Sequence, residues 1–241
     1  MSWFSGIAPA IVPIVLPVLF WAGYHYYKDR HLPEPVGHLF IAFLLGFLAF
    51  WLGTLAYQLL GVLNLRFDAF VLAENNPIGL AFYAVFGIGL IEELAKIVPF
   101  LLVILRFNEF DEPLDGIIYA SFIALGFAAL ENWHYLPYLV GVEAIARGFA
   151  GPVVHIVFAS IWGYYIGAAH LARKSVVKAV MGALAVTALL HGVYDYVAIA
   201  MPATALPLSA LLVVVLWIWR LRLIRNLHGL AGHHPQTDRA E

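Results

Sequence analysis

The sequence predicts an all-α protein: a polytopic transmembrane helical bundle of about seven spans, forming a single membrane domain over residues 1–241. Of the 241 residues, 63% are hydrophobic and only 12% are charged, whereas soluble domains carry about 25% charged residues. The mean hydropathy is +0.88. Apolar runs of about 20 residues, the length that crosses a bilayer, recur along the whole chain.

The seven expected spans are separated by short polar connections. They cover residues 7–27, 36–60, 78–105, 114–136, 152–172, 176–201 and 205–225. Pro99 interrupts the third span, because proline cannot donate to the carbonyl of Ala95. Trp217, Trp219, Arg220, Arg222 and Arg225 are expected to anchor the last span at an interface. The catalytic helices are expected within residues 78–201, and 226–241 are expected to be a disordered tail.

The distribution of Lys and Arg predicts the orientation. Ten of the thirteen fall on one side of the predicted topology, while only Arg66 and Arg147 fall on the other and Lys96 lies within a span. The positive-inside rule then places the N-terminus outside and the C-terminus in the cytoplasm.

The third span contains two carboxylates and an amine at a depth where charge is costly. Glu92, Glu93 and Lys96 lie within its apolar run. Each charge at the centre of a bilayer costs about 2.5–3.5 kcal/mol on insertion scales, so intramembrane charges indicate partners and function. On a helix the two acids point apart and Lys96 falls between them one turn later, placed to brace both.

Four more ionisable residues fall inside spans four to six, at depths that agree with one another. Glu131, His155, His191 and Asp195 are all predicted in the outer half of the membrane. Asn132 (the neighbour of Glu131), His155, and Asp195 with His191 each continue a stripe of small residues at four-residue spacing, the pattern that lets membrane helices approach closely. The polar side chains are therefore expected to face neighbouring helices and to share one site.

Acids and histidines without a Ser or Cys nucleophile indicate water activation. A carboxylate can act as general base while a histidine holds the water or stabilises an oxyanion. Two histidines with one or two carboxylates would equally suit zinc with an open coordination position. The absence of cysteine excludes disulfides and thiolate-bound metal. The net charge of −2 argues against nucleic acid as a partner.

These residues carry a family resemblance. In order along the chain, Glu92-Glu93-x-x-Lys96, Phe127-x-x-x-Glu131-Asn132, His155 and His191-Gly192-x-x-Asp195 resemble the motifs of the PrsW family of intramembrane proteases. The segment 110–116 also resembles the lead into that family's second motif. The family is itself similar to the CAAX-processing and bacteriocin-immunity membrane proteases.

The resemblance implies cleavage of a membrane-anchored protein near the extracytoplasmic face of the bacterial cell membrane, such as an anti-sigma factor in stress signalling. It implies that Glu92 and Glu93 supply the base and its support, with Lys96 and Asn132 assisting. His155 and His191 would bind the water, the oxyanion or a metal. Glu131 and Asp195 would orient them or join as ligands. A divalent metal such as zinc, held by Glu131, His155, His191 and Asp195, is therefore one of the two alternatives. No other cofactor is expected.

Two other functions fit parts of the pattern. Intramembrane chains of acids and histidines also form proton relays, which would suit a proton-coupled transporter; the spans, however, show no inverted repeat. A non-catalytic membrane scaffold could keep the same fold, but the complete motifs favour an enzyme.

Overall fold

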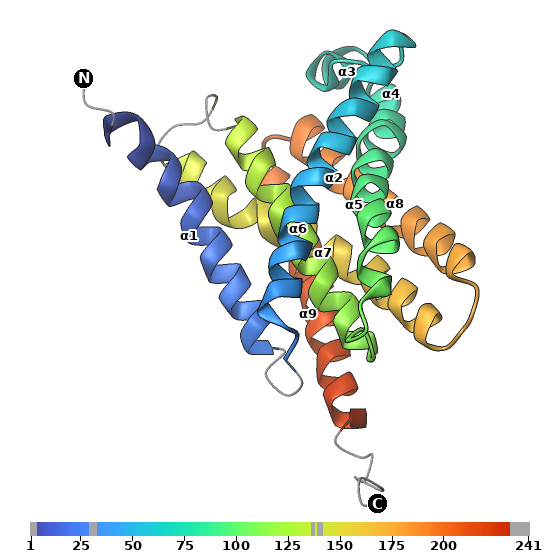
Figure 1. The fold of residues 1–241 in the computed structure, drawn as a ribbon. Coiled ribbons are helices and arrows are strands. Elements are labelled where there is room, and N and C mark those ends of the chain that lie inside the picture. The colour runs from blue at the N-terminus through green and yellow to red at the C-terminus, as the bar shows by residue number, and fades with distance from the viewer. Residues whose placement is uncertain (1–3, 29–32, 136–137, 139–141, 232–241) are drawn as a thin grey trace, which may run out of the picture.

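The computed structural model describes residues 4–28, 33–135, 138 and 142–231, and every regular element within them is helical (Figure 1). The all-α prediction is therefore confirmed. The elements are α1 (Phe4–Lys28), α2 (Val36–Val62), α3 (Ala69–Asn75), α4 (Pro77–Phe82), the π-helix η1 (Tyr83–Gly89), α5 (Leu90–Leu102), the 3₁₀ turn η2 (Ile104–Arg106), α6 (Pro113–Tyr135), α7 (Val142–Leu171), α8 (Val176–Ala200) and α9 (Ala205–Ala231).

Within the described residues, five helices are long and apolar enough to cross a membrane: α2, α6, α7, α8 and α9. The first and third predicted spans are not among them. Residues 78–105 form the succession α4, η1, α5 and η2, and α1 is a 25-residue helix. The free ends of α1 and α9 lie at opposite ends of the bundle (Figure 1), as an odd number of crossings would place them. The count of seven and the orientation stay predictions.

Two predicted boundaries are wrong. Helix α7 begins at Val142, ten residues before the predicted start, so Arg147 belongs to a helix and not to a loop. Helix α9 continues to Ala231, so the disordered tail expected from residue 226 does not begin there. Residues 232–241 lie outside the described part of the chain.

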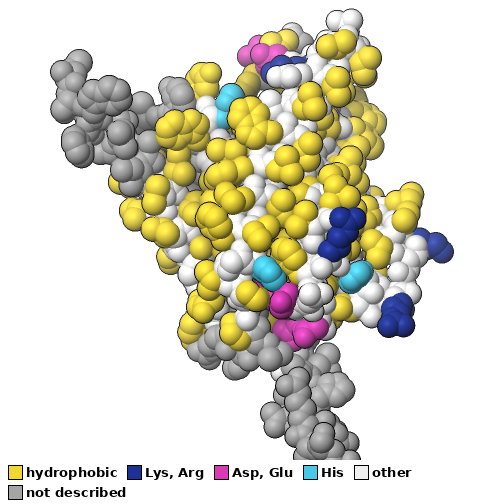
Figure 2. Space-filling view, in the orientation of Figure 1, with side chains coloured by type: hydrophobic (Ala, Val, Ile, Leu, Met, Phe, Trp, Pro, Cys, Tyr) yellow, Lys and Arg dark blue, Asp and Glu magenta, His cyan; other side chains and the backbone are white. Residues whose placement is uncertain are grey.

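Helix α6 is the centre of the bundle. In the 18-residue apolar stretch of α6 that could cross a membrane, 89% of the residues are buried, against 11% in the corresponding stretch of α9. It packs most extensively against α7 and α2. Hydrophobic side chains cover most of the face shown in Figure 2. Large apolar residues such as Leu206, Phe40 and Met181 are exposed on the bundle. Such a surface suits contact with lipid hydrocarbon.

Helices α6 and α7 approach closely because both present glycine at the crossing point. A Cβ on Gly116 would collide with the carbonyl oxygen of Gly163, and a Cβ on Gly163 would collide with that of Gly116. Both residues lie on the small-residue stripes seen in the sequence, and close backbone approach is how such stripes stabilise membrane helix pairs. This crossing fixes α7, and with it His155, against the central helix.

The variant Gly163→Ala is expected to destabilise the protein by about 1–3 kcal/mol, because the new methyl group meets rigid backbone. Denaturant unfolding in detergent micelles measures the change. The matched control is Gly23→Ala in α1, where a Cβ meets no atom within 4 Å. Equal stability of the two variants would contradict the close crossing.

The π-helix η1 leads directly into the helix that carries the two acids. A Cβ on Gly192 of α8 would lie 2.6 Å from Cα of Val85 in η1, and one on Gly89 would lie 2.6 Å from the carbonyl oxygen of Ala188. Glycine at both positions lets η1 and α8 touch along their backbones. Because α5 follows η1 without a break, this contact brings Glu92 and Glu93 beside His191.

Arg220 does not anchor an interface as the sequence suggested. Its side chain is fully buried, with Nε donating to Ser160 Oγ at 2.7 Å and Nη2 donating to Ser121 Oγ at 3.1 Å. It joins α9 to α7 and α6 through two hydroxyl groups. Nothing in the sequence distinguishes Arg220 from its neighbours Arg222 and Arg225. Its burial depends on two hydroxyl partners, Ser160 and Ser121, which lie far from it along the chain.

Candidate active site

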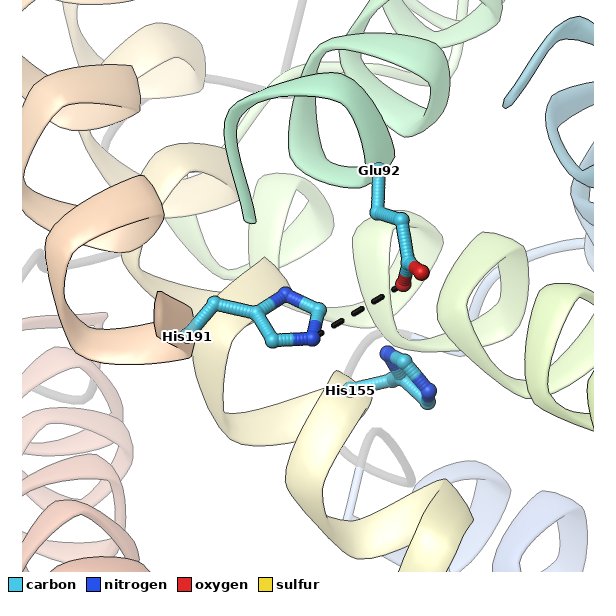
Figure 3. Close-up of side chains that lie close together, drawn as sticks. All are labelled: Glu92, His155 and His191. Carbon is cyan, nitrogen blue, oxygen red and sulfur yellow. Dashed lines mark ion pairs between the residues drawn. The ribbon is translucent and has the colours of Figure 1, made fainter. Parts of the chain in front are cut away.

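Three helices bring an acid and two histidines together inside the bundle. Glu92 comes from α5, His155 from α7 and His191 from α8 (Figure 3). All three side chains are buried, and one ligand atom from each lies within 4.8 Å of the others. Glu93 and Lys96 adjoin the group from α5, Asp195 from α8 and Glu131 from α6.

Glu93 is the most completely bonded carboxylate of the site. It is fully buried. Its Oε1 accepts from Lys96 Nζ and from His191 Nδ1, both at 2.8 Å, and its Oε2 accepts from Trp162 Nε1 at 2.9 Å. Charge-assisted bonds to both oxygens stabilise the ionised form and leave little capacity to accept another proton. Glu93 therefore fixes α5, α7 and α8 relative to one another.

Glu92 is the opposite case, because one of its oxygens is unused. Tyr57 donates to Oε1 at 3.1 Å, but Oε2 is buried without a hydrogen-bond partner. Two basic groups lie close to Oε2: His191 Nε2 at 3.7 Å and Lys96 Nζ at 4.0 Å. Both separations are too long for a direct hydrogen bond, so Oε2 remains available to a further partner such as a water or an ion at this gap.

Asp195 faces the same gap from the next turn of α8. Its Oδ2 lies 3.6 Å from His191 Nε2 and is also buried without a hydrogen-bond partner. His191 uses Nδ1 to bond Glu93, so its other nitrogen points into the space between Glu92 and Asp195. A carboxylate that holds one ring nitrogen and aims the other is how proteins orient histidines in metal and acid–base sites.

His155 is held in a similar way by a second carboxylate. Its Nε2 bonds Glu131 Oε2 at 2.6 Å, and its Nδ1 lies 2.9 Å from Lys96 Nζ. Because an ammonium can only donate, His155 Nδ1 is the accepting nitrogen. Its Nε2 then carries the hydrogen and donates a hydrogen bond to Glu131. Arg147 Nη2 donates to the other oxygen of Glu131 at 3.0 Å. Glu131 therefore belongs to the site through His155.

Asn132 lies apart from the acids. Its side chain is buried, and Nδ2 donates to the carbonyl of Gly148 at 3.4 Å. It connects the end of α6 to the first turns of α7, so its support for the site passes through the helix backbone.

Three residues of the network were not found from the sequence: Tyr57, Arg147 and Trp162. Trp162 lies seven residues after His155, on the same helix face, and this spacing could have identified it. Arg147 precedes His155 by eight residues, but it was assigned to a loop because α7 was predicted to begin too late. Tyr57 has no sequence signal, since tyrosines are frequent throughout these spans.

The donor set fits a divalent metal, although with a different set of ligands from the one expected. Glu92, His155 and His191 present ligand atoms within 4.8 Å of one another, and the bare Oε2 of Glu92 is free to coordinate. Glu92 was absent from the expected metal set, whereas Glu131 was included and already binds His155 and Arg147. One acid and two histidines with an open position is a composition found in zinc hydrolases.

The apolar bundle and its buried acid–histidine group define an integral membrane protein with a polar site in its interior. The family model described as PrsW family intramembrane metalloprotease matches residues 34–220. The chain belongs to this family. It is a peptidase, and its place is the bacterial cell membrane.

Curated relatives are similar to this chain over most of its length. Protease PrsW of Geobacillus kaustophilus is 32% identical over 235 residues, covering 97% of this chain and 94% of the relative. Protease PrsW of Oceanobacillus iheyensis is 33% identical, with 89% and 90% covered. Protease PrsW of Bacillus subtilis is 33% identical, with 80% of each chain covered. No solved structure matches the chain.

Proposed function

We propose that this protein is an intramembrane endopeptidase that activates water at Glu92 Oε2 and cleaves a membrane-anchored protein. The observation that carries the proposal is the unpartnered Oε2 of Glu92, which lies 3.7 Å from His191 Nε2, too far for a direct hydrogen bond, and is therefore available to a water. Two of the surrounding acids are engaged elsewhere, Glu93 by three donors and Glu131 by His155 and Arg147. Asp195 also keeps an unpartnered oxygen and is the alternative acceptor.

The side chains define a sequence of proton transfers. Glu92 Oε2 accepts a proton from the water as the water oxygen bonds to the carbonyl carbon of the substrate. His191, with its Nε2 facing the gap, stabilises the resulting oxyanion when it is protonated. Glu92 then returns the proton to the leaving amine nitrogen as the peptide carbon–nitrogen bond breaks. Tyr57 and Glu93 hold Glu92 and His191 in position throughout.

A metal, when bound, would supply Lewis-acid polarisation and lower the pKa of a bound water to about 7. Glu92, His155 and His191 are the residues that would hold it. His155 Nδ1 would first have to release Lys96, which keeps its bond to Glu93. With Glu92 engaged as a ligand, Asp195 Oδ2 is the remaining unpartnered acceptor beside His191.

We further propose that the scissile bond lies toward the extracytoplasmic face, and that an anti-sigma factor is a suitable substrate. The first part rests on the asymmetric distribution of Lys and Arg along the sequence. The second rests on the family resemblance, which links these motifs to stress signalling.

The proposal is tested with purified protein in liposomes and a labelled single-span substrate. Wild-type protein is expected to cleave it, and His191→Ala is expected to abolish cleavage. Zinc is measured by elemental analysis of protein purified without added metal. Stoichiometric zinc that is lost in His191→Ala supports the metal-dependent form, and activity that survives chelation in metal-free protein supports the glutamate form. Proton flux without any proteolysis would reject the endopeptidase.

A further inference from the structure

A second concave feature lies on the outer surface, between α7, α8 and α9. It is an apolar slot of about 830 Å³, within the ~300–1,000 Å³ range of small-molecule sites. Apolar side chains of all three helices form most of its lining, including Ile161, Tyr165, Val186, Leu190 and Leu216. None of the site's acids or histidines lines it. We refer to it as the α7–α9 slot.

One end of the α7–α9 slot carries two cations. Lys174 and Lys178 line it there, beside Ser175. The turn that presents them has a fixed backbone: Arg173 adopts a positive φ of 51°, and Lys174 N donates to the Ala169 carbonyl at 2.8 Å. The backbone therefore places Lys174 just before α8 and Lys178 in its first turn, so both lysines lie at the N-terminal end of the helix, where the helix dipole adds to the attraction for an anion.

The middle of the slot is open. No atom lies within 4 Å of the position that a Cβ would take on Gly182 of α8, and the neighbouring Val186 is half exposed. From Lys178 to Leu190 the slot follows α8 for about 18 Å at 1.5 Å per residue. This length is close to one leaflet of hydrocarbon, about 15 Å thick. A straight apolar chain that starts at the lysines would fill it.

We propose that the α7–α9 slot binds one anionic phospholipid, with its phosphate on Lys174 and Lys178 and an acyl chain along α8 toward Leu190. The two lysines decide between this and other occupants. A hydrophobic helix, whether from a substrate or from a second copy of the chain, has no need of paired cations at one end, whereas an acidic headgroup does. Each basic residue near a membrane surface strengthens anionic-lipid binding about fivefold.

The lipid can be detected through Trp219, which lines the slot. Phosphatidylglycerol with brominated acyl chains, titrated into the purified full chain in neutral micelles, is expected to quench this tryptophan. The Trp219 signal is the difference between wild type and Trp219→Phe. Brominated phosphatidylcholine serves as the neutral comparison and is expected to quench much less at equal concentration.

Two variants test the two halves of the site. Lys174→Ala/Lys178→Ala is expected to weaken binding of the anionic lipid by about 30-fold. Gly182→Phe, which fills the open middle, is expected to remove quenching by either lipid. The charge-matched control is Arg222→Ala/Arg225→Ala, which removes two cations from a smaller basic hollow of about 390 Å³ beside Lys28. This control is expected to leave Trp219 quenching unchanged.

Three results would overturn the proposal. Equal quenching by the neutral and the anionic lipid would show that the lysines select nothing. Loss of quenching in the Arg222/Arg225 control but not in the lysine variant would place the headgroup in the other hollow. Full competition by inorganic phosphate at micromolar concentration would show an anion site that does not require the acyl chain.

Discussion

Glutamine in place of Glu92 is expected to reduce kcat for cleavage of a single-span substrate by about 10²–10⁴-fold, the usual contribution of a general base. Glutamine keeps the shape of the side chain, and its carbonyl oxygen can still accept from Tyr57. It lacks the basic oxygen that Oε2 provides. Stability should change little, because no hydrogen bond to Oε2 is lost. Initial rates in liposomes and unfolding in the same detergent measure the two effects.

The control for Glu92→Gln is Tyr57→Phe, which removes the bond to Oε1 but keeps the base. A smaller loss of kcat than in Glu92→Gln is expected, since only the positioning of Glu92 is affected. If Glu92→Gln cleaves at the wild-type rate, the proton acceptor is another residue, and Asp195 with its unpartnered Oδ2 is the next candidate.

Loss of Glu93 is expected to have the largest effect on stability. The variant Glu93→Ala leaves Lys96 buried without its closest carboxylate, and also removes the acceptor of His191 and Trp162. Breaking a buried ion pair by removing one partner typically costs about 3–5 kcal/mol. Denaturant unfolding in micelles is the direct measurement.

The double variant Glu93→Met/Lys96→Met distinguishes an unpaired charge from a lost helix contact. Apolar replacement of both members of a buried pair is often nearly neutral, so the double variant should be more stable than Glu93→Ala while remaining inactive. A double variant less stable than Glu93→Ala would show that the charges themselves hold α5, α7 and α8 together.

The sequence predicted which ionisable side chains lie together because charge inside an apolar segment is conspicuous; their catalytic roles stay predictions. Glu92, Glu93 and Lys96 had no place on a lipid-facing surface, and the small-residue stripes indicated that His155 and His191 face other helices. Their convergence depends only on depth and helix face, both of which follow from residue spacing. The acid–histidine group in the structure comes from the helices in which it was expected.

The unpredicted features depend on hydrogen bonds that residue composition and spacing do not reveal. A π-helix differs from an α-helix by the register of its backbone bonds, so the composition of 83–89 gave no sign of it. The difference between the neighbouring acids Glu92 and Glu93 is set by residues far along the chain: Trp162 bonds the second oxygen of Glu93, whereas Tyr57 bonds only one oxygen of Glu92. Arg220 likewise became an interior residue through two serines on other helices.

The burial of α6 bears on how the protein is assembled. In the folded bundle the neighbouring helices cover α6. Its apolar stretch nevertheless has a mean hydropathy of 1.6, equal to that of α7, whose apolar stretch is only 56% buried. A segment of this hydropathy can enter the membrane alone, before the helices that later surround it are in place. Its apolar residues therefore contact lipid tails first and other helices later. Its glycines contribute only at the later step, when α6 packs against its neighbours.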